Sequence, residues 1–243
     1  MKPELVEQIN RLPLFEKRRV YLRDRFSEGY IEQEDFRAIV ETGSDRALAV
    51  VTRDYALVQL REGFRKIVEK LPENIAGRVD HYRGRACMTV YPEGEDIGLY
   101  AVNSVDGSSA LRVDFVVRGD FGRIFIPRRV AGLRRIHRGR IETEFENFLD
   151  VIARVKSAWF SIVQTLSQRA AREEDIKTFS DLLGKRGARE LETWLAGHPQ
   201  PTVWELVKQA VRIISGRRYK TELHRSERLR RVSFAILAYA LKE

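Results

Sequence analysis

The chain has 243 residues, of which 43% are hydrophobic and 33% are charged, and its net charge is +9. No stretch approaches the roughly 20 apolar residues of a membrane span, and the first residues lack the apolar run of a secretory signal. The single cysteine, Cys87, excludes an internal disulfide framework and a cysteine-based zinc site. We therefore expect a cytoplasmic protein with one large domain or two small ones.

The first 70 residues are expected to be largely helical. Apolar residues recur at spacings of three and four through residues 1–40, which predicts amphipathic helices that are broken at Pro13 and Gly29. Residues 47–60 are rich in apolar and β-branched side chains, which favours a strand. A further helix is expected over residues 61–70.

The central part of the chain has the period of β-structure. Between residues 78 and 126, apolar and polar side chains alternate, and clusters of Pro, Gly and Asp at 92–96 and 119–122 predict turns. Consecutive short strands joined by tight turns predict an antiparallel meander. Asp106-Gly107, between two alternating runs, is typical of the tip of a hairpin with a type I′ turn.

From residue 142 the apolar period becomes helical. Thr143 and Glu146 have the spacing of a capping box, and the helix that they begin is expected to end near residue 171. Further helices are expected over residues 173–184, 186–196, 202–214 and 224–241. The order of elements predicts an α+β fold, with N-terminal helices, an antiparallel β meander packed on one long helix, and a helical C-terminal tail. We expect an α+β core domain over residues 1–171 and a helical subdomain over residues 172–243.

The Asp-Gly turn has neither the pattern of a phosphate-binding loop nor that of a serine nucleophile. A phosphate loop needs glycines that open a helix, whereas Gly107 lies between β-patterned runs and the chain has neither a Walker nor a GxGxxG pattern. Ser108 and Ser109 are not part of a GxSxG motif, and the four histidines are scattered. The sequence therefore predicts no catalytic residue and no cofactor.

Acidic residues in the turns are the candidates for metal ligands. Two turns would have to meet for them to hold a divalent cation, and neither an EF-hand pattern nor a paired-carboxylate spacing supports this. We expect no metal at these positions, which are Glu93, Glu95, Asp96 and Asp106.

Positive charge is concentrated in two parts of the sequence. Residues 118–140 hold eight Arg against one Asp, and residues 212–231 hold eight Lys or Arg against two Glu. We call these segments the first and second basic windows. An anionic strand would neutralise them through phosphate contacts with release of counterions. The residues expected to contact nucleic acid are Arg118, Arg123, Arg128, Arg129, Arg134, Arg135, His137, Arg138, Arg140, Arg217, Arg218, Arg228 and Arg231.

The arginines also have two interpretations that do not involve nucleic acid. The windows could pair with the N-terminal region, because residues 1–60 hold eleven acidic residues against ten basic ones. The scarcity of Asn and Gln beside many charged residues is also typical of thermophilic proteins. Aromatic residues on or beside the expected sheet are candidates for stacking on bases, and these are Tyr82, Tyr91, Tyr100, Phe121 and Phe125.

Three segments resemble a known family. They are VVTRDYALVQLREGF (50–64), NSVDGSSALRV (103–113) and RIHRG (135–139), and Thr202-Val203-Trp204-Glu205 with Ala210 adds a fourth match. Over residues 47–241 the chain is similar to the phage/plasmid-like family of unknown function. It departs from that family at Phe125-Ile126-Pro127-Arg128, where a Cys-Asn step is typical. The resemblance implies a fold and a mobile-element context, and no enzymatic activity.

The order of β meander and long helix is also similar to the core of single-strand annealing recombination proteins, which form rings or filaments on single-stranded DNA. No helix-turn-helix, zinc-finger or RRM pattern is found, so binding is expected to be sequence-tolerant. We therefore expect a non-enzymatic, homo-oligomeric protein that binds or anneals single-stranded DNA. The alternative is a structural or interaction protein of a mobile element that docks an acidic protein partner.

Overall fold

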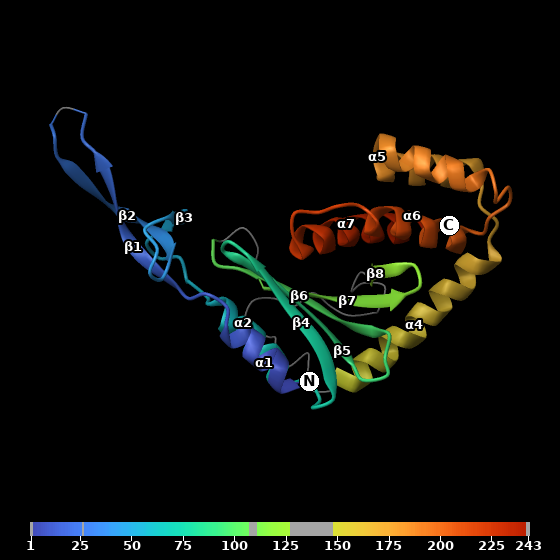
Figure 1. The fold of residues 1–243 in the computed structure, drawn as a ribbon, viewed down its shortest axis with the longest axis horizontal. Coiled ribbons are helices and arrows are strands. Elements are labelled where there is room, and N and C mark those ends of the chain that lie inside the picture. Colours follow the sequence, from blue (N-terminus) through green and yellow to red (C-terminus); the bar gives the residue numbers. More distant parts are fainter. Residues whose placement is uncertain (1, 26, 107–110, 127–147, 242–243) are drawn as a thin grey trace. The chain divides into compact units, whose positions relative to one another are not determined.

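The structure, a computed structural model, describes residues 2–25, 27–106, 111–126 and 148–241 (Figure 1). Its helices are α1 (Lys2–Asn10), α2 (Leu60–Glu69), α4 (Phe148–Gln168), α5 (Glu173–Leu195), α6 (Val203–Ser215) and α7 (Glu222–Ala240). Its strands are β1 (Phe15–Arg23), β2 (Tyr30–Glu41), β3 (Ala47–Thr52), β4 (Ile75–Tyr82), β5 (Arg85–Pro92), β6 (Ile97–Ser104), β7 (Arg112–Gly119) and β8 (Gly122–Ile126). The fold is α+β, as predicted. Among the described residues, no helix combines the length and the apolar character needed to cross a membrane.

The chain divides into two compact units. The first unit contains the described residues of 2–90 and 100–113, and the second contains those of 91–99, 114–126 and 148–241. The predicted division into residues 1–171 and 172–243 stays a prediction.

The first unit begins with α1 and the antiparallel sheet β1-β2-β3. The prediction of helices through residues 1–40 is wrong beyond Asn10, because residues 15–23 and 30–41 are paired strands. Most side chains of the β1–β2 hairpin are exposed or only partly buried. Its sequence therefore lacks the alternation of apolar and polar residues that marks a strand with one buried face. Helix α2 was predicted, and it buries one face through Leu60, Phe64, Ile67 and Val68.

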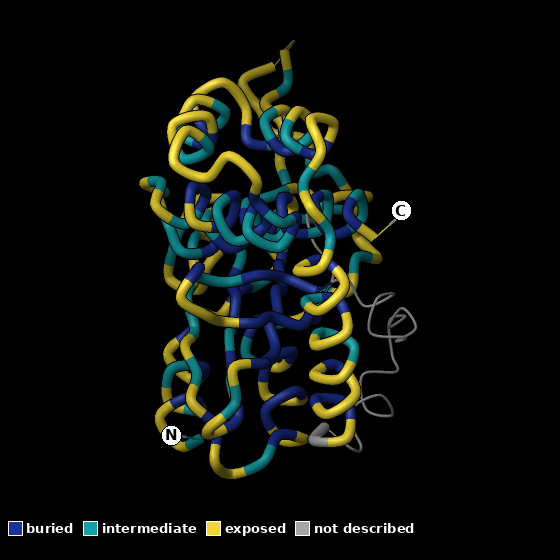
Figure 2. Tube along the Cα trace, turned by 90° about the vertical axis from the view of Figure 1, so that its right-hand side faces the viewer, coloured by how far each residue is buried: buried dark blue, intermediate teal, exposed yellow. Residues whose placement is uncertain are grey.

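The meander predicted between residues 78 and 126 is confirmed. Strands β4 to β8 form one sheet in chain order, and β7 pairs with β8 in an antiparallel register through the tight turn at Asp120 and Phe121. All eight residues of β6 are buried. Buried positions form an unbroken run along β6, whereas they alternate with half-buried and exposed positions in helices such as α6 and α7 (Figure 2).

The second unit places α6 and α7 against β8 (Figure 1). Helix α5 is interrupted at Gly184, whose φ of 72° and ψ of 171° are not helical, and this confirms the predicted break between residues 184 and 186. Trp204 packs edge-on against Phe121 and Trp159, with ring centroids 5.6 and 5.4 Å away. The predicted start of the long helix at Thr143 lies outside the described residues, and α4 is described from Phe148.

Candidate nucleic-acid interface

The described part of the first basic window adjoins the second one. Arg118 and Arg123 are direct cross-strand partners on β7 and β8, at the start of the first window. Two like charges in this position repel each other, and each arginine has its own carboxylate. Arg118 donates to Asp96 over 3.0 Å, and Arg123 forms an ion pair with Glu222, the first residue of α7.

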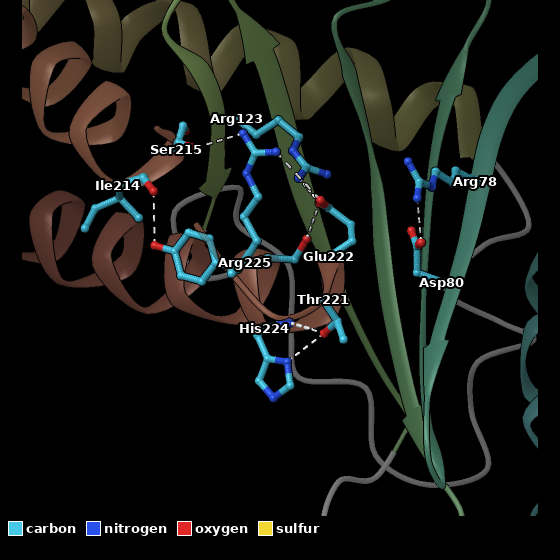
Figure 3. Close-up of polar contacts among 11 residues, drawn as sticks. Arg78, Asp80, Arg123, Ile214, Ser215, Thr221, Glu222, His224 and Arg225 are labelled. Atoms are coloured by element: carbon cyan, nitrogen blue, oxygen red, sulfur yellow. Dashed lines mark hydrogen bonds and ion pairs between the residues drawn. The ribbon is translucent and has the colours of Figure 1, made fainter. Parts of the chain in front are cut away.

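Glu222 is shared between both windows (Figure 3). Its carboxylate accepts from Arg123 of the first window, lies 3.8 Å from Arg225 of the second, and accepts from the Ser226 hydroxyl over 3.1 Å. The side chains of Arg123 and Glu222 are about four-fifths buried, with exposed fractions of 21% and 20%. One partly buried carboxylate therefore serves two guanidinium groups, which leaves local positive charge in excess.

A second ion pair joins the windows at the β7–β8 turn. Arg212 of α6 donates to Asp120 over 2.5 Å, and the two side chains are 45% and 72% exposed. Asp120 is the single acidic residue of the first window. The two segments, about 90 residues apart in sequence, are thus held together at the β7–β8 turn and at the start of α7.

Tyr91 lies beneath the Arg118 guanidinium, whose central carbon is 4.7 Å from the ring centroid. Burial raises the pKa of Tyr91 to about 12, with Asp96 and Glu222 adding to the rise, while Arg123 and Arg118 oppose it. The Tyr91 hydroxyl is buried and has no hydrogen-bond partner in the structure. The Tyr91 ring therefore supports Arg118, and its own face is covered by that arginine.

Several arginines of the second window bind helix ends. Gly184 interrupts α5, which frees the preceding carbonyls, and Arg217 donates to that of Leu183 over 3.1 Å. Arg228 lies 3.4 Å from the carbonyl of Leu182. Cations near the C-terminal end of a helix are stabilised by its dipole. A carbonyl does not cancel the charge of a guanidinium, so these arginines hold the fold together and still contribute positive potential.

The C-terminal end of α6 is bound in the same way. Arg225 donates to the Ser215 carbonyl over 2.9 Å, and the Tyr219 hydroxyl donates to the Ile214 carbonyl over 3.0 Å (Figure 3). Sequence reasoning missed this use of the second window. Gly184 and Gly216 each end a helical segment, and a helix end leaves carbonyls that a nearby arginine can bind. These two glycines were the signal that could have indicated this role of the arginines.

The predicted contact residues thus fall into three groups. Arg118, Arg123, Arg217 and Arg228 are in the structure and have partners within the second unit. Arg218 and Arg231 are exposed, and no ion pair is described for either. The remaining ones lie outside the described residues, and they are Arg128, Arg129, Arg134, Arg135, His137, Arg138 and Arg140.

Most of the aromatic candidates belong to the core. Tyr100 and Phe125 are fully buried and Phe121 is 8% exposed, so none of these three rings is open to a base. Tyr82 is half-buried, with the guanidinium of Arg83 5.2 Å from its ring centroid. The prediction that these rings stack on bases is therefore wrong for the three buried ones.

Two of the four acidic turn residues, Glu95 and Asp96, are engaged in ion pairs. Glu95 accepts from Lys156 over 2.8 Å, and Asp96 pairs with Arg118. No group of three or more His, Cys, Asp or Glu side chains that could hold a metal ion is found in the described ranges. The two candidate nucleophiles, Ser108 and Ser109, lie outside those ranges.

Comparison of the chain with protein-family models, with curated proteins and with solved structures finds no match. The resemblance to the phage/plasmid-like family therefore stays a prediction from the sequence. Charge and geometry within the second unit are what support a function for this chain.

Proposed function

We propose that this protein is a non-enzymatic, sequence-tolerant nucleic-acid-binding protein. The two basic windows contact the phosphates of single-stranded DNA, and the protein acts in recombination or in the maintenance of a mobile element. In this proposal the protein is a cytoplasmic homo-oligomer. The observation that carries it is the joining of the windows through Asp120–Arg212 and through Glu222, which serves Arg123 and Arg225.

The arrangement supports phosphate binding because the acidic residues at the junction are already used. Asp120 bridges to Arg212, and Glu222 serves two guanidinium groups. Arg217 and Arg228 donate to backbone carbonyls and keep their full charge. Arg218 and Arg231 extend from the same segment into solvent. A polyanion would gain from this excess through counterion release, without any contact to base edges.

The acidic N-terminal region has basic neighbours of its own. Glu7 pairs with Arg11, Glu32 with Arg19, and Arg18 with both Glu16 and Asp45. These pairs lie within the first unit. They reduce the amount of acidic charge that is left to neutralise the windows, and this favours an external anion.

A filter-binding experiment tests the proposal. Purified protein is titrated into a labelled 30-nucleotide single strand, a duplex of the same length and a polyglutamate chain, at several salt concentrations. The proposal expects tighter binding to the single strand than to polyglutamate, with affinity falling as salt rises. Absence of oligonucleotide binding at low salt contradicts it, and preference for polyglutamate favours an acidic protein partner.

A second experiment tests the non-enzymatic part of the proposal. Incubation of the protein and the oligonucleotide with Mg²⁺ should leave the oligonucleotide intact, and cleavage would contradict the non-enzymatic assignment.

A further inference from the structure

The distal half of the β1–β2 hairpin is a ribbon of only two strands. Strand β3 pairs with residues 36–40 of β2, so residues 30–34 have no neighbour on that side in the described sheet. The distal pairs are Tyr21↔Glu32, Leu22↔Ile31 and Arg23↔Tyr30. An uncovered two-stranded ribbon is marginally stable in water.

The ribbon exposes large apolar side chains on both faces. Leu22 and Ile31 are opposite each other and are 56% and 53% exposed. Tyr21 and Tyr30, on the other face, are 50% and 72% exposed. Four of the six side chains in the distal pairs are thus apolar or aromatic and half or more exposed. Apolar groups gathered in this way mark an interaction site.

Within the described part of the chain, the outer edge of β1 is covered at its base alone. The Gln59 side-chain amide donates to the Phe15 carbonyl over 2.7 Å and accepts from the Phe15 N–H over 3.0 Å, as a neighbouring strand would. Alternate residues of a strand direct their backbone groups to the same edge, so Lys17 is the next residue to face outward. From Lys17 to Arg23, no described residue of another element binds this edge through the backbone. Unpaired edges are templates for a further strand.

Charge indicates which partner fits. Residues 15–25 hold five basic residues against two acidic ones, whereas residues 30–41 hold four acidic residues against one Arg. The ribbon itself, residues 19–32, has three of each sign. A neutral ribbon offers little counterion release to nucleic acid. Another copy of this chain, in contrast, brings a basic edge to an acidic one.

We propose that the outer edge of β1 in one copy pairs with residues 30–34 of β2 in a second copy, which extends the sheet between molecules. Basic β1 then faces acidic β2, and the exposed tyrosines and aliphatic side chains of neighbouring ribbons cover each other. The contact joins two different surfaces, so it repeats from copy to copy and forms a ring or a filament. The inference rests on the self-association within the proposed function, but not on nucleic-acid binding.

Two charge reversals test this pairing. Arg23 of β1 and Glu34 of β2 are exposed, and neither takes part in an ion pair among the described residues. Arg23→Glu lowers the net charge of residues 15–25 from +3 to +1, and Glu34→Arg changes that of residues 30–41 from −3 to −1, so each variant has a weaker charge difference between the two edges. Each variant alone should raise by about tenfold the concentration at which the protein self-associates. An equimolar mixture should restore assembly, because the changed residue of one variant then meets the oppositely charged changed residue of the other.

Sedimentation velocity of the full chain without nucleic acid, over a range of protein concentrations at low salt, gives the readout. Arg46→Glu, at an exposed site in the β2–β3 connection, is the matched control and should assemble like the wild type. Circular dichroism checks that each variant is folded. The inference is overturned by a monomeric wild type, by variants that assemble normally, or by a mixture that stays monomeric. Binding of each variant to a short oligonucleotide is measured in parallel, and it should be unchanged, so loss of assembly and loss of DNA binding are distinguished.

Discussion

Arg123 on β8 and Glu222 at the start of α7 form an ion pair across 99 residues of sequence. The same carboxylate lies beside Arg225, so one acidic group holds an arginine from each basic window. The windows were identified by composition alone, and their proximity follows from the packing of β8 against α6 and α7. Removing this carboxylate is therefore expected to change both the stability of the second unit and its net positive charge.

The variant Glu222→Gln should lower stability and raise affinity for nucleic acid. Arg123 would lose its charged partner at a site that is 21% exposed, which is expected to cost about 1–3 kcal/mol of unfolding free energy. The added net positive charge should tighten oligonucleotide binding at low salt. Urea unfolding and filter binding measure the two effects. Glu192→Gln, at an exposed position of α5, changes charge equally and should leave stability unaltered. Weaker oligonucleotide binding by Glu222→Gln would contradict the proposed interface.

Replacement of Gly184 by Ala should destabilise the helical tail. A Cβ at this position meets nothing within 4 Å, so the cost comes from the backbone, which has a φ of 72° and a ψ of 171°. This region is accessible essentially to glycine alone, and the expected loss is about 1–3 kcal/mol. Gly197→Ala is the matched control, because its backbone is ordinary and its Cβ meets only an atom 3.8 Å away. Equal unfolding midpoints for the two variants would refute the strained break in α5.

Thr202 caps α6, and Thr202→Ala should cost about 1 kcal/mol. Its hydroxyl accepts from the Glu205 N–H over 3.2 Å, and the Glu205 carboxylate accepts from the Thr202 N–H over 2.7 Å. These bonds lower the pKa of Glu205, so the stability they give should be lost as pH falls through that lowered pKa. Thr193→Ala removes an exposed hydroxyl from the last turn of α5 and should be close to neutral. Urea unfolding at neutral pH compares the two variants, and a larger loss of stability in Thr193→Ala would contradict the capping role of Thr202.

Tyr91 should make the protein sensitive to alkaline pH. Burial raises the pKa of its hydroxyl from 10.0 to about 12, which means that folding favours the protonated form. The resulting stability is complete below pH 10 and is lost as pH rises toward 12, by about 2–3 kcal/mol in total. Tyr91→Phe should lack this loss, and because the hydroxyl has no partner in the structure, it should be as stable as the wild type at pH 7. Thermal unfolding at pH 9 to 11.5 measures the difference. Parallel pH curves for the two proteins would exclude this role of Tyr91.

The fold was predictable where burial makes the sequence periodic. The strands from β5 to β8, helix α2 and the break at Gly184 were all expected, because each has one clear apolar period or one glycine with a required conformation. The hairpin of β1 and β2 was missed for the opposite reason. Leu22 and Ile31 are both about half exposed, so the ribbon has no buried face there. Without a buried face, its sequence does not need the alternation of apolar and polar residues by which a strand is recognised.

The candidate site was predictable only as an excess of charge. Composition located both basic windows, but it could not indicate that Arg217 and Arg228 bind the carbonyls next to Gly184. Nor could it separate them from Arg218 and Arg231, which are exposed. That distinction depends on contacts between α5 and the chain after α6, between residues that are 34 and 46 positions apart in the sequence.

The slope of log affinity against log salt for a single-stranded oligonucleotide tests the central claim most directly. It is measured for the wild type and for the double variant Arg218→Glu/Arg231→Glu. Arg46→Glu/Arg53→Glu, at two exposed positions outside both windows, is the matched control. If Arg218 and Arg231 each contact a phosphate, the double variant should reduce the slope by about 1.4, at about 0.7 for each contact. The control should keep the wild-type slope. An unchanged slope in the double variant, or an equal reduction in the control, would contradict the claim that the joined basic windows bind nucleic acid.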